Sequence, residues 1–144
     1  MWGNVTYEEK HMDLFAVDES YHLAHCIASD LRMGAGIAVP MQTHFGLREK
    51  IKRSGENVQY PTCILTDRVF NLITKRLSRD KPFLISLIVT LKKMKQIALD
   101  NDIKQIAMPM IGCGLDRLDW KVVSDKIQSI FADTDIDILV CEWR

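Results

Sequence analysis

The chain of 144 residues carries 19 basic and 19 acidic residues, so its formal net charge is zero at pH 7. This balance argues against a general nucleic-acid binder, which needs a strong positive field, but it allows one small anionic ligand. With 47% hydrophobic and 26% charged residues, the sequence is typical of a globular protein. Its length predicts a single domain over residues 1–144 with a sizeable core.

Strand-like and helix-like segments alternate along the chain. In the first half, the sequence predicts a short strand from residue 5, a strand over 21–27, a helix over 36–45 with Pro40 in its first turns and a basic helix over 47–53. Paired strands over 58–66 and 69–75 follow, and then a long helix over 82–99 with Pro82 in its first turn. The last elements are a strand over 104–108, a helix over 119–132 and a closing strand over 136–143. This alternation predicts an α/β fold with a mixed, largely parallel sheet.

Two glycine-rich loops each follow a predicted strand and precede a predicted helix: Gly34-Ala35-Gly36-Ile37-Ala38 and Ile111-Gly112-Cys113-Gly114-Leu115-Asp116. Glycine lets backbone N–H groups approach a ligand closely, and a helix N-terminus adds unpaired donors. In open α/β sheets, ligands bind outside the carboxyl ends of the strands. Either loop alone is read most simply as a tight turn, whereas the two together predict a cleft that grips a nucleotide diphosphate from both sides.

Other ligand motifs fit poorly. The third glycine of a dinucleotide fingerprint would fall on Val39, and no Gly-Lys-Ser/Thr of a P-loop is present. No Cys-x5-Arg pattern follows Cys113, so a packed loop residue is favoured over a phosphatase nucleophile. The four histidines show no metal-binding spacing, and neither a metal nor another cofactor is predicted.

Cysteine usage and the N-terminus bear on location. Cys26, Cys63, Cys113 and Cys141 form no CxxC pair, which predicts free thiols in a reducing, cytoplasmic compartment. Residues 1–9 contain acidic residues rather than the pattern of a signal peptide. The longest apolar stretch, residues 83–91, is too short to span a bilayer. We therefore expect a cytoplasmic monomer with no membrane partner.

Four segments carry a resemblance to the macro domain family, and in particular to its terminal ADP-ribose protein glycohydrolase branch. They are His25-Cys26-Ile27, Arg32-Met33-Gly34-Ala35-Gly36-Ile37-Ala38-Val39, Leu72-Ile73-Thr74-Lys75 and Ile111-Gly112-Cys113-Gly114-Leu115-Asp116-Arg117-Leu118. The resemblance runs over nearly the whole chain. It implies a three-layer α/β sandwich, with a mixed, largely parallel sheet between helices, and ADP-ribose as the ligand.

The resemblance also implies roles for individual residues. Asp13 corresponds to the acid that accepts a hydrogen bond from the adenine amino group, with Leu14 beside it. The first glycine loop, residues 34–38, corresponds to the loop along the distal ribose and diphosphate. Residues 110–115, which begin at Met110, correspond to the second phosphate loop, and Trp143 lies near the adenosine. Two positions depart from the family pattern, since Met12 replaces a glycine and Ala28 replaces a small hydroxyl residue that Ser29 could supply.

For catalysis, the resemblance implies that Lys75 attacks the anomeric carbon of the distal ribose and that Asp116 completes the reaction. From the residues alone, Lys75 could be a solvated lysine and Asp116 a helix cap. The expected function is hydrolysis of ADP-ribosyl esters, either on glutamate and aspartate side chains of proteins or in O-acetyl-ADP-ribose. An ADP-ribose 1-phosphate phosphatase or a non-catalytic ADP-ribose reader are the alternatives, and the expected partner is ADP-ribose or an ADP-ribosylated protein.

Overall fold

The computed structural model describes residues 6–113 and 118–142. Their elements are β1 (Tyr7–His11), the 3-10 helix η1 (Leu14–Ala16), β2 (His22–Ala28), α1 (Ala38–Phe45), α2 (Leu47–Ser54), β3 (Thr62–Thr66), β4 (Val69–Lys75), α3 (Leu84–Asp100), β5 (Gln105–Met108), α4 (Trp120–Phe131) and β6 (Asp137–Glu142). Apart from η1, which the sequence did not predict, the order of elements is the predicted one. None of the helices in these two ranges is long and apolar enough to cross a membrane.

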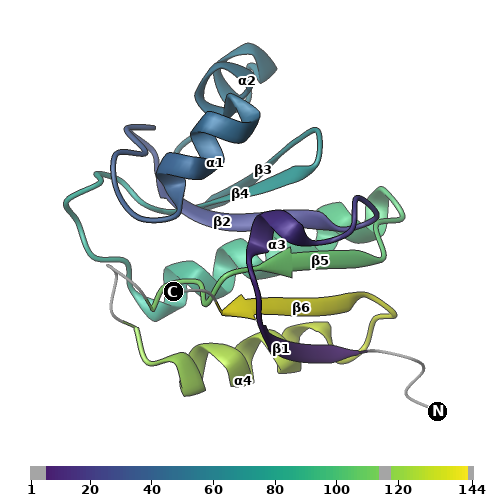
Figure 1. Cartoon of the computed structure of the whole chain (residues 1–144). Coiled ribbons are helices and arrows are strands. Elements are labelled where there is room, and N and C mark those ends of the chain that lie inside the picture. The colour runs from purple at the N-terminus through teal and green to yellow at the C-terminus, as the bar shows by residue number, and fades with distance from the viewer. Residues whose placement is uncertain (1–5, 114–117, 143–144) are drawn as a thin grey trace.

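All the strands join one sheet in the order β1-β6-β5-β2-β4-β3 (Figure 1). Neighbours from β1 to β4 run parallel, and only β3 is antiparallel to its neighbour β4. The prediction of a mixed, largely parallel sheet is therefore confirmed. Parallel strands need crossover connections, and in this chain helices supply them.

Helices cover both faces of the sheet and give two hydrophobic cores. The first core lies under α3 and α4 and contains Leu87, Met94 and Phe131. The second lies under α1 and α2 and contains Met41 and Ile51. The sheet side chains alternate between the two cores, as strands buried on both faces require. The result is the expected three-layer sandwich.

Several predicted boundaries were wrong, each for a local reason. The helix expected over 36–45 begins only at Ala38, because Gly36 has a φ of 62° and lies outside the helical region. The helix expected over 82–99 begins at Leu84, because its N-cap Phe83 is extended, so Pro82 precedes the first turn. The strand expected over 58–66 begins only at Thr62, directly after a proline that cannot donate to the ladder.

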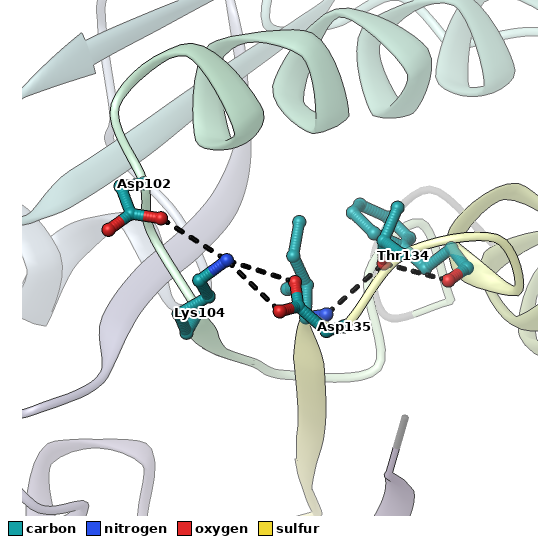
Figure 2. Close-up of polar contacts among 6 residues, drawn as sticks. Asp102, Lys104, Thr134 and Asp135 are labelled. Carbon is teal, nitrogen blue, oxygen red and sulfur yellow. Dashed lines mark hydrogen bonds and ion pairs between the residues drawn. The ribbon is translucent and has the colours of Figure 1, made fainter. Parts of the chain in front are cut away.

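The amino edge of β5 and β6 is held by charges on the two loops that enter these strands (Figure 2). Lys104 Nζ lies 3.0 Å from Asp135 Oδ2 and 3.2 Å from Asp102 Oδ1. These hydrogen bonds raise the pKa of Lys104, with the bond to Asp135 as the largest cause. Thr134 Oγ1 accepts from Ile136 N at 3.2 Å and fixes the turn beside it. This network lies at the opposite edge from the loops predicted to bind a ligand.

Candidate functional site

The predicted site residues that the structure describes collect at the carboxyl edge of the sheet. Because β1, β6, β5, β2 and β4 are parallel, their carboxyl ends meet at one edge, on the left of Figure 1. Asp13 follows β1, the first glycine loop follows β2, Lys75 ends β4, and residues 109–113 follow β5. Tertiary structure thus brings together residues that lie far apart in the sequence.

The topology of the sheet changes direction between β2 and β5. These neighbouring strands pair through His22 with Ile106 and through Leu23 with Ala107. The chain leaves β2 toward α1 over the second core, whereas it leaves β5 toward α4 over the first core. Connections that diverge to opposite faces mark a topological switch point, where open α/β sheets bind ligands. The two glycine loops flank this point.

The first glycine loop is exposed, but the segment that leads into it is fixed by buried side chains. The side chains of Leu31 and Met33 are buried in the second core, although both residues have positive φ values of 56° and 49°. Such angles are strained for bulky residues and persist only where the surroundings enforce them. Gly34, Ala35 and Gly36 follow and are exposed. A Cβ placed on Gly34 would meet nothing within 4 Å.

Polar contacts hold this loop in place. Arg48, on α2, donates from Nε to Leu31 O at 2.7 Å and from Nη2 to Arg32 O at 2.5 Å. Asp30 accepts from Ser78 N at 2.8 Å and from Ser78 Oγ at 2.7 Å, which joins the loop after β2 to the loop after β4. Desolvation is the largest single effect and raises the pKa of Asp30, but the hydrogen bonds from Ser78 and Arg32, with the charge of Arg32, together lower it.

The residues that start α1 offer fewer free donors than the sequence suggested. Val39 N–H bonds to Gly36 O at 3.2 Å, and Pro40 has no N–H. Ala38 is buried and Ile37 is half-buried as the helix N-cap. Donors for an anion on this side would therefore come from the loop before the helix rather than from its first turn.

The described part of the second glycine loop, residues 111–113, packs against the first core. Ile111 is buried there, and Met110, Gly112 and Cys113 are half-buried. Gly112 has a φ of 76°, and a Cβ on it would lie 3.0 Å from Leu118 Cδ1 and 3.3 Å from Leu87 Cδ2. The glycine is thus required by backbone conformation and by close packing.

A β-bulge controls the direction of Lys75. In the pairing of β2 with β4, Ile27 faces Ile73 but Ala28 faces Lys75, so Thr74 is the extra residue. Paired residues on neighbouring strands share a face of the sheet, and a bulge re-aims the side chains beyond it. Without the bulge, Lys75 would share the face of Ile73, which packs in the second core. With it, Lys75 shares the opposite face, toward α3.

The half-buried Lys75 also borders a cavity of about 270 Å³. The cavity lies between the end of β4 and the start of α3 and is lined by Tyr60, Thr74, Lys75, Arg76, Asp80, Lys81, Pro82, Phe83 and Ser86. Ser86 precedes Leu87, the residue against which Gly112 packs. The first turns of α3 therefore adjoin both the cavity beside Lys75 and Gly112 of the second glycine loop.

Asp13 stands at the far end of the same edge. It is half-buried and caps η1, where its Oδ1 accepts from Phe15 N at 2.9 Å. Burial of the Cys141 thiol raises its pKa to about 11, and the negative charge of Asp13 adds to this shift. The neighbouring Leu14 is buried in the second core, so its side chain supports the turn. The ring of Phe15 stacks on His44 with centroids 4.3 Å apart.

The two departures from the family pattern have local consequences. Met12 N donates to Glu142 O at 2.9 Å, which extends the pairing of β1 with β6 toward Asp13. Ala28 is buried, and the hydroxyl of Ser29 donates to Arg76 O at 2.7 Å. The Ser29 proton is therefore committed to the protein.

Four predicted site residues lie outside the described residues: Gly114, Leu115, Asp116 and Trp143. The N-cap of α4 is Asp119, whose side chain accepts from Lys121 N at 3.0 Å. The capping role that the sequence offered to Asp116 thus belongs to Asp119. Within the described part of the chain, no group of three or more His, Cys, Asp or Glu side chains could hold a metal ion.

A buried histidine lies on the strand that leads to the first glycine loop. His25 is fully buried, and desolvation lowers its pKa to about 4, against a smaller opposing effect of its bond to Asn71. The Nε2 and Asn71 Oδ1 atoms are 2.7 Å apart. The strand that leads to the second loop, β5, carries no titratable side chain.

Sequence reasoning missed the residues that hold the site. Arg48 lies in a basic helix and carries no motif, and Asp30 and Ser78 are ordinary loop residues 48 positions apart. The bulge at Thr74 also leaves no mark in the sequence. No local pattern could have identified them, because each acts on a segment that is distant in the chain.

Comparisons with known proteins agree with this geometry. The chain is 43% identical to the ADP-ribose glycohydrolase OARD1 of Homo sapiens over 134 residues, which cover 89% of the chain and 86% of that protein. In fold it matches the macrodomain of Thermus aquaticus DarG with a TM-score of 0.81 and 18% identity, over 96% of the chain and 99% of that structure.

A second solved macrodomain, that of Mycobacterium tuberculosis DarG, gives a TM-score of 0.80 at 21% identity and covers 96% of the chain and 98% of that structure. No protein-family model matches the chain. The likeness to the two solved structures shows the fold, and the identity with OARD1 shows the branch. The chain therefore belongs to the macrodomain family, in the same branch as ADP-ribose glycohydrolase OARD1.

Proposed function

We propose that this protein binds ADP-ribose along the carboxyl edge of its sheet and hydrolyses the ester between ADP-ribose and an acyl group. The relative at 43% identity is named an ADP-ribose glycohydrolase. The observation that carries the proposal is the bulge at Thr74, which directs Lys75 toward the face where the second glycine loop packs. Covalent catalysis requires a nucleophile at this position, and the amine of lysine can supply it.

In the proposed reaction, Lys75 Nζ forms a bond to the anomeric carbon of the distal ribose. The bond from that carbon to the acyl oxygen breaks, and the acid leaves as a carboxylate. Water then displaces the amine, which releases ADP-ribose and restores the lysine. Lysine suits this step because its amine can become neutral, whereas the guanidinium of arginine stays charged.

The other assignments are part of the same proposal. Asp116 takes the proton from the amine and returns it, a role that rests on the resemblance to the glycohydrolase branch. Asp13 accepts a hydrogen bond from the adenine amino group, and the two glycine loops hold the diphosphate. Glutamate- or aspartate-linked ADP-ribose and O-acetyl-ADP-ribose are the proposed substrates. A cytoplasmic location and a monomeric state remain predictions.

The test is single-turnover hydrolysis of glutamate-linked ADP-ribose by the wild type and by Lys75→Arg, with ADP-ribose binding measured by calorimetry. We expect Lys75→Arg to bind ADP-ribose nearly as well and to hydrolyse the ester on the order of 10³-fold more slowly. Near-equal rates would exclude the lysine nucleophile and leave an attack by water. Tight binding with no turnover by the wild type would favour a reader, and release of phosphate from ADP-ribose 1-phosphate would favour the phosphatase.

A further inference from the structure

The cavity beside Lys75 is too small for the whole ligand. Its volume of about 270 Å³ lies below the range of roughly 300–1,000 Å³ that pockets for drug-sized ligands span. Its lining comes from the end of β4 and the start of α3 and includes no residue from the described part of either glycine loop. The cavity is therefore distinct from the proposed ADP-ribose cleft, although Lys75 borders it.

Its floor contains buried hydroxyl groups. Thr74 is 1% exposed, and its Oγ1 has no hydrogen-bond partner among the described residues. Ser86, from the first turns of α3, is 7% exposed and lines the same cavity. Buried polar atoms in folded proteins are nearly always paired. The Thr74 oxygen itself exposes less than 1 Å² to solvent, so this hydroxyl lies behind the cavity wall and does not contact an occupant directly.

Its rim carries positive charge. Arg76 and Lys81 are exposed, and neither forms an ion pair with any residue in 6–113 or 118–142. The one acid of the cavity, Asp80, accepts from Leu77 N at 3.2 Å and so serves the local turn. The lining therefore has two exposed basic side chains, Arg76 and Lys81, against one acidic side chain that serves the local turn, which favours a negatively charged occupant.

The rim is also apolar. Two exposed large hydrophobic side chains, Tyr60 and Phe83, line the cavity, and exposed Ile85 and Val89 continue along α3 from Phe83. Phe83 is 72% exposed. Ile85 and Val89 share one face of α3 with Lys93, whose Nζ bonds to Thr62 Oγ1 at 2.6 Å, so this face adjoins the segment that contains Tyr60. Exposed aromatic side chains that surround a pocket are typical of protein interfaces.

We propose that this cavity and its rim bind the polypeptide from which ADP-ribose is removed, and that they favour an acidic segment with an apolar residue next to the modified side chain. The inference rests on the proposed function. The cleaved bond lies at Lys75, so the acyl side of the substrate must leave from that point. The cavity admits one or two side chains, the cations face neighbouring carboxylates, and Phe83 and Tyr60 contact the apolar neighbour.

A nucleic-acid strand fits the same surface less well. Backbone phosphates are recognised by extended basic grooves, and this chain has no net charge. Bases could stack on Tyr60 and Phe83, but the neighbouring aliphatic side chains Ile85 and Val89 offer no flat surface for further bases. A polypeptide uses the apolar face and the two cations together.

The experiment compares two substrates that share ADP-ribose but differ in the acyl part. One is an acidic peptide with an ADP-ribosylated glutamate beside a leucine, and the other is O-acetyl-ADP-ribose. We expect Phe83→Ser combined with Lys81→Glu to raise KM for the peptide by about tenfold, as loss of a contact on the scale of an interface hot spot would do. Hydrolysis of O-acetyl-ADP-ribose and affinity for ADP-ribose should stay within twofold of the wild type.

The matched control is Leu99→Ser combined with Lys92→Glu, which makes the same types of change at exposed positions farther along α3. It should leave KM for both substrates unchanged. Equal KM values for the peptide in wild type and test variant would overturn the peptide subsite, as would an equal loss on both substrates. If an ADP-ribosylated oligonucleotide is included as a third substrate, a rise in KM for that substrate alone would assign the surface to nucleic acid instead. Failure of the wild type on every ester would overturn the proposed function itself.

Discussion

The two glycine loops resemble each other in sequence, yet the structure holds them by different forces. The first loop lies on buried Leu31 and Met33 in strained backbone and is tied down by Arg48 and Asp30. The second loop packs directly into the first core, where Gly112 touches side chains of α3 and of the segment before α4. Polar contacts hold the first loop, and apolar packing holds the second.

This difference separates ligand binding from stability. A Cβ at Gly34 would enter open space, so glycine there leaves room for a ligand. A Cβ at Gly112 would enter the protein, so glycine there permits the fold. Substitutions in the second loop should therefore act mainly on unfolding, whereas substitutions in the first should act mainly on ADP-ribose affinity.

The largest expected effect is on stability and comes from Gly112→Ala. A side chain at a φ of 76° is strained, and contacts of 3.0 and 3.3 Å require Leu118 or Leu87 to move. Together these costs should lower the free energy of unfolding by about 2–4 kcal/mol in urea denaturation. The control is Gly55→Ala, with a φ of 71° and nothing within 4 Å of its Cβ. Equal losses in the two variants would show that packing at Gly112 contributes nothing.

Acid should lower the free energy of unfolding through His25, which lies on β2, the strand that leads to the first glycine loop. His25 is held neutral in the folded chain with a pKa of about 4, whereas an unfolded histidine titrates near 6.5. The unfolded state therefore binds the extra proton as pH falls from about 6.5 to 4, and stability decreases by roughly 3 kcal/mol over this range. Urea denaturation at pH 7 and pH 4 measures the loss. In His25→Gln, which cannot titrate, a pH dependence as large as that of the wild type would rule out this assignment.

Removal of the Arg48 side chain, which holds the segment that leads into the first glycine loop, should lower both the stability of the protein and its affinity for ADP-ribose. Arg48→Met deletes two hydrogen bonds to Leu31 O and Arg32 O and should cost about 1–2 kcal/mol of unfolding free energy. ADP-ribose affinity should fall several-fold in calorimetry, because the loop loses its preformed shape. Lys104→Met is the control, since Lys104 also bridges two loops but at the amino edge. If both variants bound ADP-ribose as the wild type does, the clamp would have no role in binding.

The smallest change in stability is expected for Gly34→Ala. Its Cβ meets no atom within 4 Å, so the free energy of unfolding should stay within about 0.5 kcal/mol of the wild type. If the diphosphate lies against this backbone, the added methyl group should nevertheless lower ADP-ribose affinity several-fold. Unchanged affinity would place the ligand away from Gly34 and would contradict the role of the first glycine loop in binding ADP-ribose.

Local signals in the sequence were enough to predict most elements. Helix α2 ends at Gly55, which has a left-handed backbone, and Asp119 caps the start of α4. Asp67, with a φ of 51°, lies in the turn that connects β3 to β4. Each depends on neighbouring residues and on backbone preferences that a sequence displays directly. The errors also have local causes, such as the extended backbone of Phe83 before α3.

The sequence by itself determined the alternation of strands and helices, the two glycine loops at strand ends and the resemblance that singles out Lys75. These features depend on residues close together in the chain. The order of the strands, the switch point between β2 and β5, the clamp by Arg48 and the bulge that turns Lys75 were decided only by tertiary structure. The physical reason is that pairing, packing and hydrogen bonding between distant segments set each of them, and no local pattern encodes which segments will meet.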